Sequence, residues 1–157
     1  MTMTVVMNLA DTRGVIAARP PRFAGYAALF DIPDEGGDTI RRGAFTASLA
    51  ALRAKGEPLP LLWQHNGTQT IGWIEQIAED ARGLRVIARL ADGDGPRAML
   101  LRGGEVRGLS FGYRAREART IALPGGKPGR ELIGIDIFEV SLVTQPMHPD
   151  ARVHLVI

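Results

Sequence analysis

The sequence predicts a mainly β (α+β) fold: a small, mostly antiparallel β-barrel with a few short helices around it. Three observations lead to this prediction. The chain has 19 glycines and 10 prolines among 157 residues, a turn-rich composition that favours short strands over long helices. Its apolar segments are short, and turn signals separate them at hairpin spacing. A sheet built from hairpins must hide its edges, and closure into a barrel does so economically.

Chain length sets the expected domain count. A chain of 157 residues can bury one core, so we expect a single domain over residues 1–157. Residues 1–21 are expected to form an N-terminal leader of two strands that ends at Pro20 and Pro21. Residues 22–157 are expected to form the barrel core.

Alternating apolar and polar residues, bounded by turn formers, predict the strands of the core. The clearest hairpin joins 70–79 to 84–90 through a turn at 80–83, and a loop rich in glycine and proline at 124–129 marks a second hairpin. The expected core strands are 22–31, 59–64, 70–79, 84–90, 107–118, 120–123, 131–138, 140–144 and 152–157.

Two short helices and one loop complete the expected elements. Apolar residues share one helical face over 44–54, and residues 55–58 end that helix with a glycine and a proline. One or two helical turns are expected at 97–101. Residues 32–38 are expected to be a loop, and Asn66 with Gly67 a turn.

Composition excludes several classes of function. The chain has no cysteine, which rules out disulfides, thiolate catalysis and cysteine-bound zinc. Its net charge is only +2 and its basic residues are dispersed, so nucleic-acid binding has no support. No apolar run approaches the roughly 20 residues needed to cross a bilayer, and residues 1–10 do not resemble a signal peptide, so we expect the protein to stay in the cytoplasm.

Ser110 is the candidate nucleophile. Leu109 and Phe111 flank it in a strand pattern, so Ser110 points to the opposite face, where Gly108 and Gly112 leave it uncrowded. On this pattern alone, a strand face packed beside a neighbouring sheet is the more common explanation.

A serine hydroxyl needs a base and a group that orients the base. His65 ends a predicted strand and is the candidate base, with a solvated loop histidine as the alternative. The other histidines are His148, in a proline-flanked turn, and His154, in the last strand. Glu139 is the candidate orienting acid.

Strand alternation places Asp136 on the face opposite to Glu139, so only one of these two carboxylates can face the site. The alternative for Glu139 is an exposed charge at a strand edge. A metal site of His65 and Glu139 with His148 or His154 is a weaker prediction, because the spacing matches no zinc-hydrolase motif. The paired glycines at 103–104 and 125–126 lack the lysine of a phosphate-binding loop.

Five ordered segments resemble one known family, the tailed-phage prohead serine proteases. The segments are Gly25-Tyr26-Ala27-Ala28-Leu29-Phe30, Asp38 with Arg42-Gly43-Ala44-Phe45, Leu62-Trp63-Gln64-His65, Gly108-Leu109-Ser110-Phe111-Gly112-Tyr113, and Phe138-Glu139-Val140-Ser141-Leu142-Val143. The resemblance covers residues 25–153. It implies a fold like that of the herpesvirus assembly proteases, a mostly antiparallel β-barrel with surrounding helices.

The resemblance also implies a function. Members of this family work inside the procapsid in the host cytoplasm, where they cleave the scaffolding segment of the major capsid protein and then themselves. It implies no cofactor, allows a homodimer, and assigns the nucleophile to Ser110, the base to His65 and the third role to Glu139. Because the herpesvirus relatives use a second histidine in that third role, His148 or His154 remains an alternative.

Three questions stay open at this stage. Ser141 is the nearest rival to Ser110, although its position between apolar strand residues favours a buried, hydrogen-bonded hydroxyl. The oxyanion donors are either backbone N–H groups near Ser110 or the Arg107 side chain. A catalytically silent β-barrel that serves as a scaffold or assembly module is the alternative function.

Overall fold

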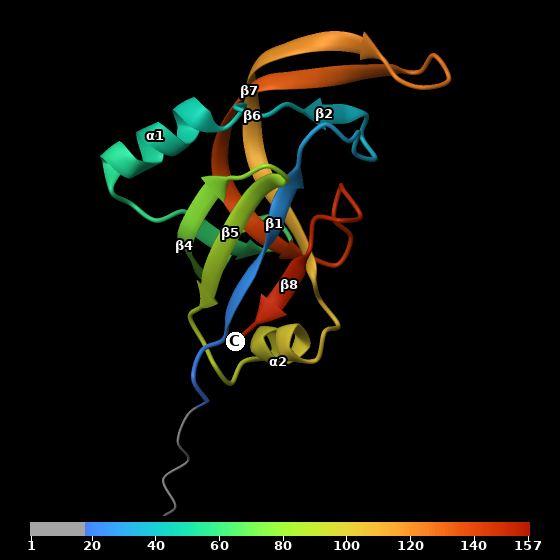
Figure 1. Cartoon of the computed structure of the whole chain (residues 1–157). Coiled ribbons are helices and arrows are strands. Elements are labelled where there is room, and N and C mark those ends of the chain that lie inside the picture. Colours follow the sequence, from blue (N-terminus) through green and yellow to red (C-terminus); the bar gives the residue numbers. More distant parts are fainter. Residues whose placement is uncertain (1–17) are drawn as a thin grey trace, which may run out of the picture.

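The structure is a computed structural model that describes residues 18–157 (Figure 1). The elements are β1 (Arg22–Leu29), β2 (Asp38–Ile40), α1 (Thr46–Lys55), β3 (Pro60–Trp63), β4 (Asn66–Glu79), β5 (Gly83–Leu90), α2 (Pro96–Arg102), β6 (Gly108–Ala122), β7 (Pro128–Val143) and β8 (Val153–Val156). The predicted mainly β fold with short helices is confirmed. The leader strands lie outside the described residues, apart from 18–21, which contain no strand.

All eight described strands belong to one sheet, in the order β2-β7-β3-β4-β5-β1-β8, with β6 paired to β7 off this path. The pairs are antiparallel except β2 with β7 and β3 with β7. The ladders therefore leave the sheet open between its ends. Two backbone hydrogen bonds, each 2.8 Å long, connect the start of β6 to the start of β8. They run from Leu109 N–H to the Ala151 oxygen and from Val153 N–H to the Arg107 oxygen. Closure into a barrel stays a prediction.

The strands β6 and β7 form a hairpin much longer than expected. They have 15 and 16 residues, so each joins two strands that the pattern separated, at residue 119 in β6 and at residue 139 in β7. The ladder continues through these charged positions because backbone pairing does not require apolar side chains, and register shifts after Gly112 and near Glu117 absorb the irregularities. The turn end of this hairpin projects beyond the rest of the molecule (Figure 1).

The short strand β2 lies where a loop was expected to end. It pairs in parallel with Arg130–Leu132 of β7. Asp38 anchors it, because its carboxylate accepts two hydrogen bonds from Arg130, at 2.8 and 2.7 Å, and one from the Tyr113 hydroxyl at 2.9 Å. A three-residue strand is too short to show alternation, which explains why the sequence pattern missed it.

The predicted turn at Asn66 and Gly67 is wrong by two residues. Trp63 pairs with Asn66 across the hairpin, so Gln64 and His65 are its two central residues. Both have a positive φ, 51° and 59°, as a type I′ turn requires. The Gln64 side chain donates to Oγ1 of Thr144 and accepts the Thr144 backbone N–H. These bonds and the pairing of Trp63 with Leu142 hold the turn at this earlier position.

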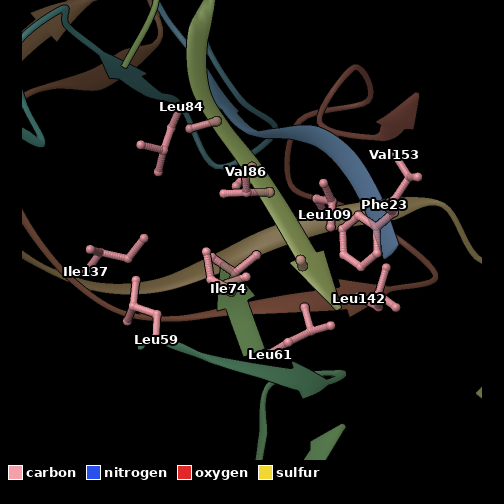
Figure 2. Close-up of a cluster of buried hydrophobic side chains, with 14 of the residues drawn as sticks. Phe23, Leu59, Leu61, Ile74, Leu84, Val86, Leu109, Ile137, Leu142 and Val153 are labelled. Carbon is pink, nitrogen blue, oxygen red and sulfur yellow. The ribbon is translucent and has the colours of Figure 1, made fainter. Parts of the chain in front are cut away.

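The core lies on one face of the three strands that matter most for the site. Leu61 of β3, Leu109 of β6, and Val140 and Leu142 of β7 have no exposed surface. Figure 2 shows Leu109 and Leu142 close to Phe23 and Val153. Neighbouring residues in these strands point to the opposite face. The core therefore orients the polar residues of β6 and β7.

Both predicted helices are present, as α1 and α2. The glycine expected to end α1, Gly56, has a φ of 70° and donates its N–H to the Leu52 oxygen, a left-handed C-cap. Within residues 18–157, neither helix has the length and apolar composition that a membrane span requires.

Candidate active site

Three adjacent strands carry the three candidate residues. Strand β7 lies between β3 and β6, in parallel with β3 and antiparallel to β6. His65 follows β3, Glu139 belongs to β7, and Ser110 belongs to β6. The sheet thus brings together residues that lie up to 74 positions apart in the chain.

His65 and Glu139 are in direct contact. The Nδ1 atom of His65 lies 2.5 Å from Oε1 of Glu139, and their side chains are 43% and 12% exposed. A carboxylate on Nδ1 holds that nitrogen as the N–H donor and leaves Nε2 free to accept a proton. This is the geometry that a general base requires.

Ser141 lies beneath this pair and joins it to the backbone. Its hydroxyl donates to Oε2 of Glu139 at 2.7 Å and accepts the backbone N–H of His65 at 3.1 Å. Ser141 has no exposed surface. The expectation of a buried, hydrogen-bonded hydroxyl is confirmed.

Ser110 shares the face of this cluster. It pairs directly with Ser141, while Gly112 pairs with Glu139, and directly paired residues point to the same side of a sheet with Cβ atoms roughly 5 Å apart. The residue is 8% exposed. Within residues 18–157 its hydroxyl forms no side-chain hydrogen bond, so the approach of His65 to Ser110 is part of the proposal below.

Other atoms approach the backbone of Gly108 and Gly112 closely, as expected of strand glycines. A Cβ at Gly112 would lie 2.5 Å from Oε1 of Glu139, and one at Gly108 would lie 2.5 Å from the Val143 oxygen and 2.9 Å from Cδ of Pro146. Gly112 therefore makes room for the carboxylate, and Gly108 makes room for the segment that follows β7.

The carboxylate of Glu139 raises the pKa of His65 above its ordinary value, chiefly through their hydrogen bond and in spite of partial burial of the ring. Glu139 therefore stabilises the protonated imidazole relative to the neutral one. Such an interaction strengthens the base as it accepts a proton.

The other candidates lie elsewhere. The prediction that Asp136 faces away from Glu139 is wrong, because a register shift at Phe138 interrupts the alternation and puts both on one face. Asp136 is nevertheless bound by Arg116 at 2.8 Å and Arg114 at 3.2 Å, and it does not contact His65. The His154 ring lies 5.8 Å from that of Tyr26, centroid to centroid. Glu139 is thus the partner of His65 in this geometry.

His148 is buried close to Ser110 without touching His65. It is 8% exposed, its Nδ1 accepts the Asp150 N–H at 3.1 Å, and its Nε2 has no hydrogen-bond partner among the described residues. His148, Asp34 and Ser110 all line one small cavity of about 30 Å³. A larger cavity of about 770 Å³ lies between α1 and β4–β5, and none of the three candidate residues lines it.

Neither a metal site nor the oxyanion donors emerge from this geometry. In residues 18–157, no three histidine, aspartate or glutamate side chains lie close enough together to hold a metal ion, so the predicted alternative metal site does not form there. The guanidinium of Arg107 lies against Gly104, where a Cβ would be 3.0 Å from Nε. The sequence pattern did not predict that contact.

A comparison with protein families decides what kind of chain this is. The model of the family described as Caudovirus prohead serine protease matches residues 10–157. The chain belongs to this family. The resemblance inferred from the five sequence segments is confirmed.

This prohead protease family member is similar in sequence to two phage proteins. The capsid polyprotein of Pseudomonas phage PAJU2 is 30% identical over 105 residues, which cover 61% of this chain and 15% of that protein. The prohead protease of Enterobacteria phage HK97 is 29% identical over 135 residues, which cover 83% of this chain and 58% of that protein. The chain thus spans only part of either relative.

Solved structures extend the likeness to herpesvirus proteases. The varicella-zoster virus protease matches 86% of this chain with a TM-score of 0.55 and 16% identity, over 63% of its own length. The KSHV protease in complex with a hexapeptide phosphonate inhibitor matches 88% with a TM-score of 0.53 and 13% identity, over 65% of its own length. At these identities the likeness concerns the fold, as the resemblance implied.

Proposed function

We propose that this prohead protease family member is a serine endopeptidase of capsid maturation, with Ser110 as nucleophile, His65 as base and Glu139 as orienting acid. The contact between His65 Nδ1 and Glu139 Oε1, 2.5 Å long, carries the proposal. It lies on the face of the sheet that holds Ser110, in a chain whose family is a protease family.

The mechanism is acyl transfer. His65 Nε2 takes the proton of the Ser110 hydroxyl as Ser110 Oγ attacks the peptide carbonyl carbon, and a tetrahedral intermediate forms. His65 then gives this proton to the amine that leaves as the C–N bond breaks. Water, deprotonated by His65, attacks the acyl-enzyme in the same way and releases the acid product and free Ser110. Glu139 holds the Nδ1–H tautomer throughout.

The proposed substrates are the scaffolding segment of the major capsid protein and the protease itself, acting inside the procapsid of an infected host cell. The two phage relatives, one named a prohead protease and the other a capsid polyprotein, support this substrate class. Closure of the sheet into a barrel, a single domain and a homodimer are further parts of the proposal. The two backbone hydrogen bonds between the start of β6 and residues 151–153 support the closure.

The first test uses a chemical probe for an activated serine. A fluorophosphonate forms a covalent bond with an activated serine, so it should label the wild type and fail to label Ser110→Ala and His65→Ala. Thr120→Ala, an exposed change on the projecting hairpin, is the matched control and should keep full labelling. Labelling that survives in Ser110→Ala would move the nucleophile elsewhere.

The substrate is tested by co-expression with the major capsid protein of the same phage, read by intact mass spectrometry. The wild type should trim the capsid protein, and Ser110→Ala should leave it whole. If both leave it whole while capsid assembly still needs the chain, the protein is the scaffold or assembly module that the sequence allowed as an alternative.

A further inference from the structure

The hydroxyl of Ser141 closes a ring of hydrogen bonds around the candidate base. It accepts the backbone N–H of His65 at 3.1 Å and donates to Glu139 Oε2 at 2.7 Å, and the other carboxylate oxygen, Oε1, lies 2.5 Å from His65 Nδ1. One hydroxyl thus holds both the backbone of the base and the carboxylate that orients its ring.

The Ser141 hydroxyl acts as a donor in one of these bonds and as an acceptor in another. A serine hydroxyl has one hydrogen to donate and lone pairs that accept. The carboxylate takes the hydrogen, since an ionised Glu139 only accepts, and the lone pair takes the N–H of His65. With Ser141 fully buried, water is unable to replace either bond.

The turn that carries His65 needs such an anchor. Gln64 and His65 both adopt left-handed backbone conformations, which cost energy in residues with a side chain. Hydrogen bonds of Gln64 tie the turn to Leu142 and Thr144, and the Ser141 bond ties it to β7 at His65 itself. Without that bond, the imidazole and the carboxylate would each gain freedom to move.

We propose that Ser141 is a positioning residue of the active site, which fixes Glu139 and the His65 backbone so that Nδ1 is bound and Nε2 is turned towards Ser110. This inference rests on the proposed function, in which His65 is the base. Ser141 touches no reacting atom, so its effect on catalysis passes through His65 and Glu139.

The test compares two variants of equal size, Ser141→Thr and Ser141→Val. Threonine keeps the hydroxyl and valine replaces it by a methyl group, so both add similar bulk in the buried site and differ only in hydrogen bonding. Isotope-labelled histidine in the full chain allows the His65 ring to be titrated by NMR, with His65→Gln assigning the signal. This measurement requires no substrate.

We expect the Val variant to show a lower His65 pKa than the Thr variant and an acid limb of kcat/KM shifted to lower pH. We also expect a kcat about tenfold to a hundredfold lower at an unchanged KM. Equal His65 titrations and equal pH profiles in the two variants, with a difference only in thermal stability, would reduce Ser141 to a structural residue and overturn the inference.

The outcome for Ser141 is separable from the outcome for the proposed function. If the wild type resists the fluorophosphonate and leaves capsid protein whole, the protease proposal fails. A difference in His65 pKa between the Thr and Val variants would then still support the role of Ser141 in positioning His65 and Glu139.

Discussion

Gly112 lies directly opposite Glu139 in the β6–β7 ladder, and a Cβ on Gly112 would lie 2.5 Å from the carboxylate oxygen that binds His65. The nearest atoms are the end of the Glu139 side chain, so the carboxylate would give way and the backbone would stay. A change at Gly112 should therefore disturb function more than stability.

Gly112→Ala should lower kcat/KM by about 100-fold, because Glu139 is pushed away from His65, and should change the free energy of unfolding by no more than about 1 kcal/mol. Peptide hydrolysis and urea unfolding measure the two effects. Gly67→Ala is the matched control, since a Cβ at Gly67 meets nothing within 4 Å. Full activity in Gly112→Ala would contradict this account of the strand glycine.

The pH dependence of kcat/KM should follow the ionisation of His65. Only the neutral imidazole accepts the serine proton, so activity should rise with pH through the His65 pKa, which Glu139 holds above the ordinary value. Glu139→Gln removes the carboxylate charge, so the acid limb should move to lower pH while the plateau falls by as much as about 10⁴-fold.

Glu117→Gln, an exposed change on the projecting hairpin, serves as control and should leave both the acid limb and the plateau in place. An acid limb that stays in place in Glu139→Gln would show that another group governs the profile, and would return the third role to one of the other histidines.

His148→Ala should lower stability without moving this pH profile. The change leaves the Asp150 N–H without its acceptor and opens a space where the buried His148 ring lay, so the free energy of unfolding should fall by about 1–3 kcal/mol. Urea unfolding measures it. If the acid limb moves instead, His148 contributes to the site as the sequence-based alternative allowed.

Tyr113 should ionise far above an ordinary tyrosine. Burial, followed by its hydrogen bond to the Asp38 carboxylate, raises the pKa of Tyr113 to about 12. A phenol with a raised pKa stabilises the fold below its unfolded value of about 10, and that contribution is lost as the pH rises through about 12. Asp38→Asn should lower the Tyr113 pKa without restoring it fully, since burial remains.

Ultraviolet titration of tyrosinate measures this pKa, and Tyr113→Phe identifies its share of the signal beside that of Tyr26. A Tyr113 that titrates near 10 in the wild type, or equally in Asp38→Asn, would mean that the cluster anchoring β2 to β6 and β7 does not form as described.

Local pattern was sufficient to predict most elements and the face on which Ser110 lies. Alternation around Leu109 and Phe111 specifies the side of the strand from which Ser110 projects, because neighbouring side chains in a regular stretch of strand point to opposite faces. The same rule failed for Asp136 and Glu139, because the register shift that leaves Phe138 unpaired puts both on one face, with Asp136 opposite Arg114 and Glu139 opposite Gly112. The glycine after α1 predicted the end of that helix for an equally local reason.

The sequence by itself determined a mainly β chain, its two helices, and a serine, a histidine and a glutamate at the right places in strands. Only the tertiary structure decided that β3 and β6 flank β7, which brings His65 onto Glu139 and places Ser141 beneath both. It also decided the turn at Gln64 and His65. The physical reason is that pairing between distant strands depends on the packing of the whole core, whereas alternation and turn residues report only on their immediate neighbours.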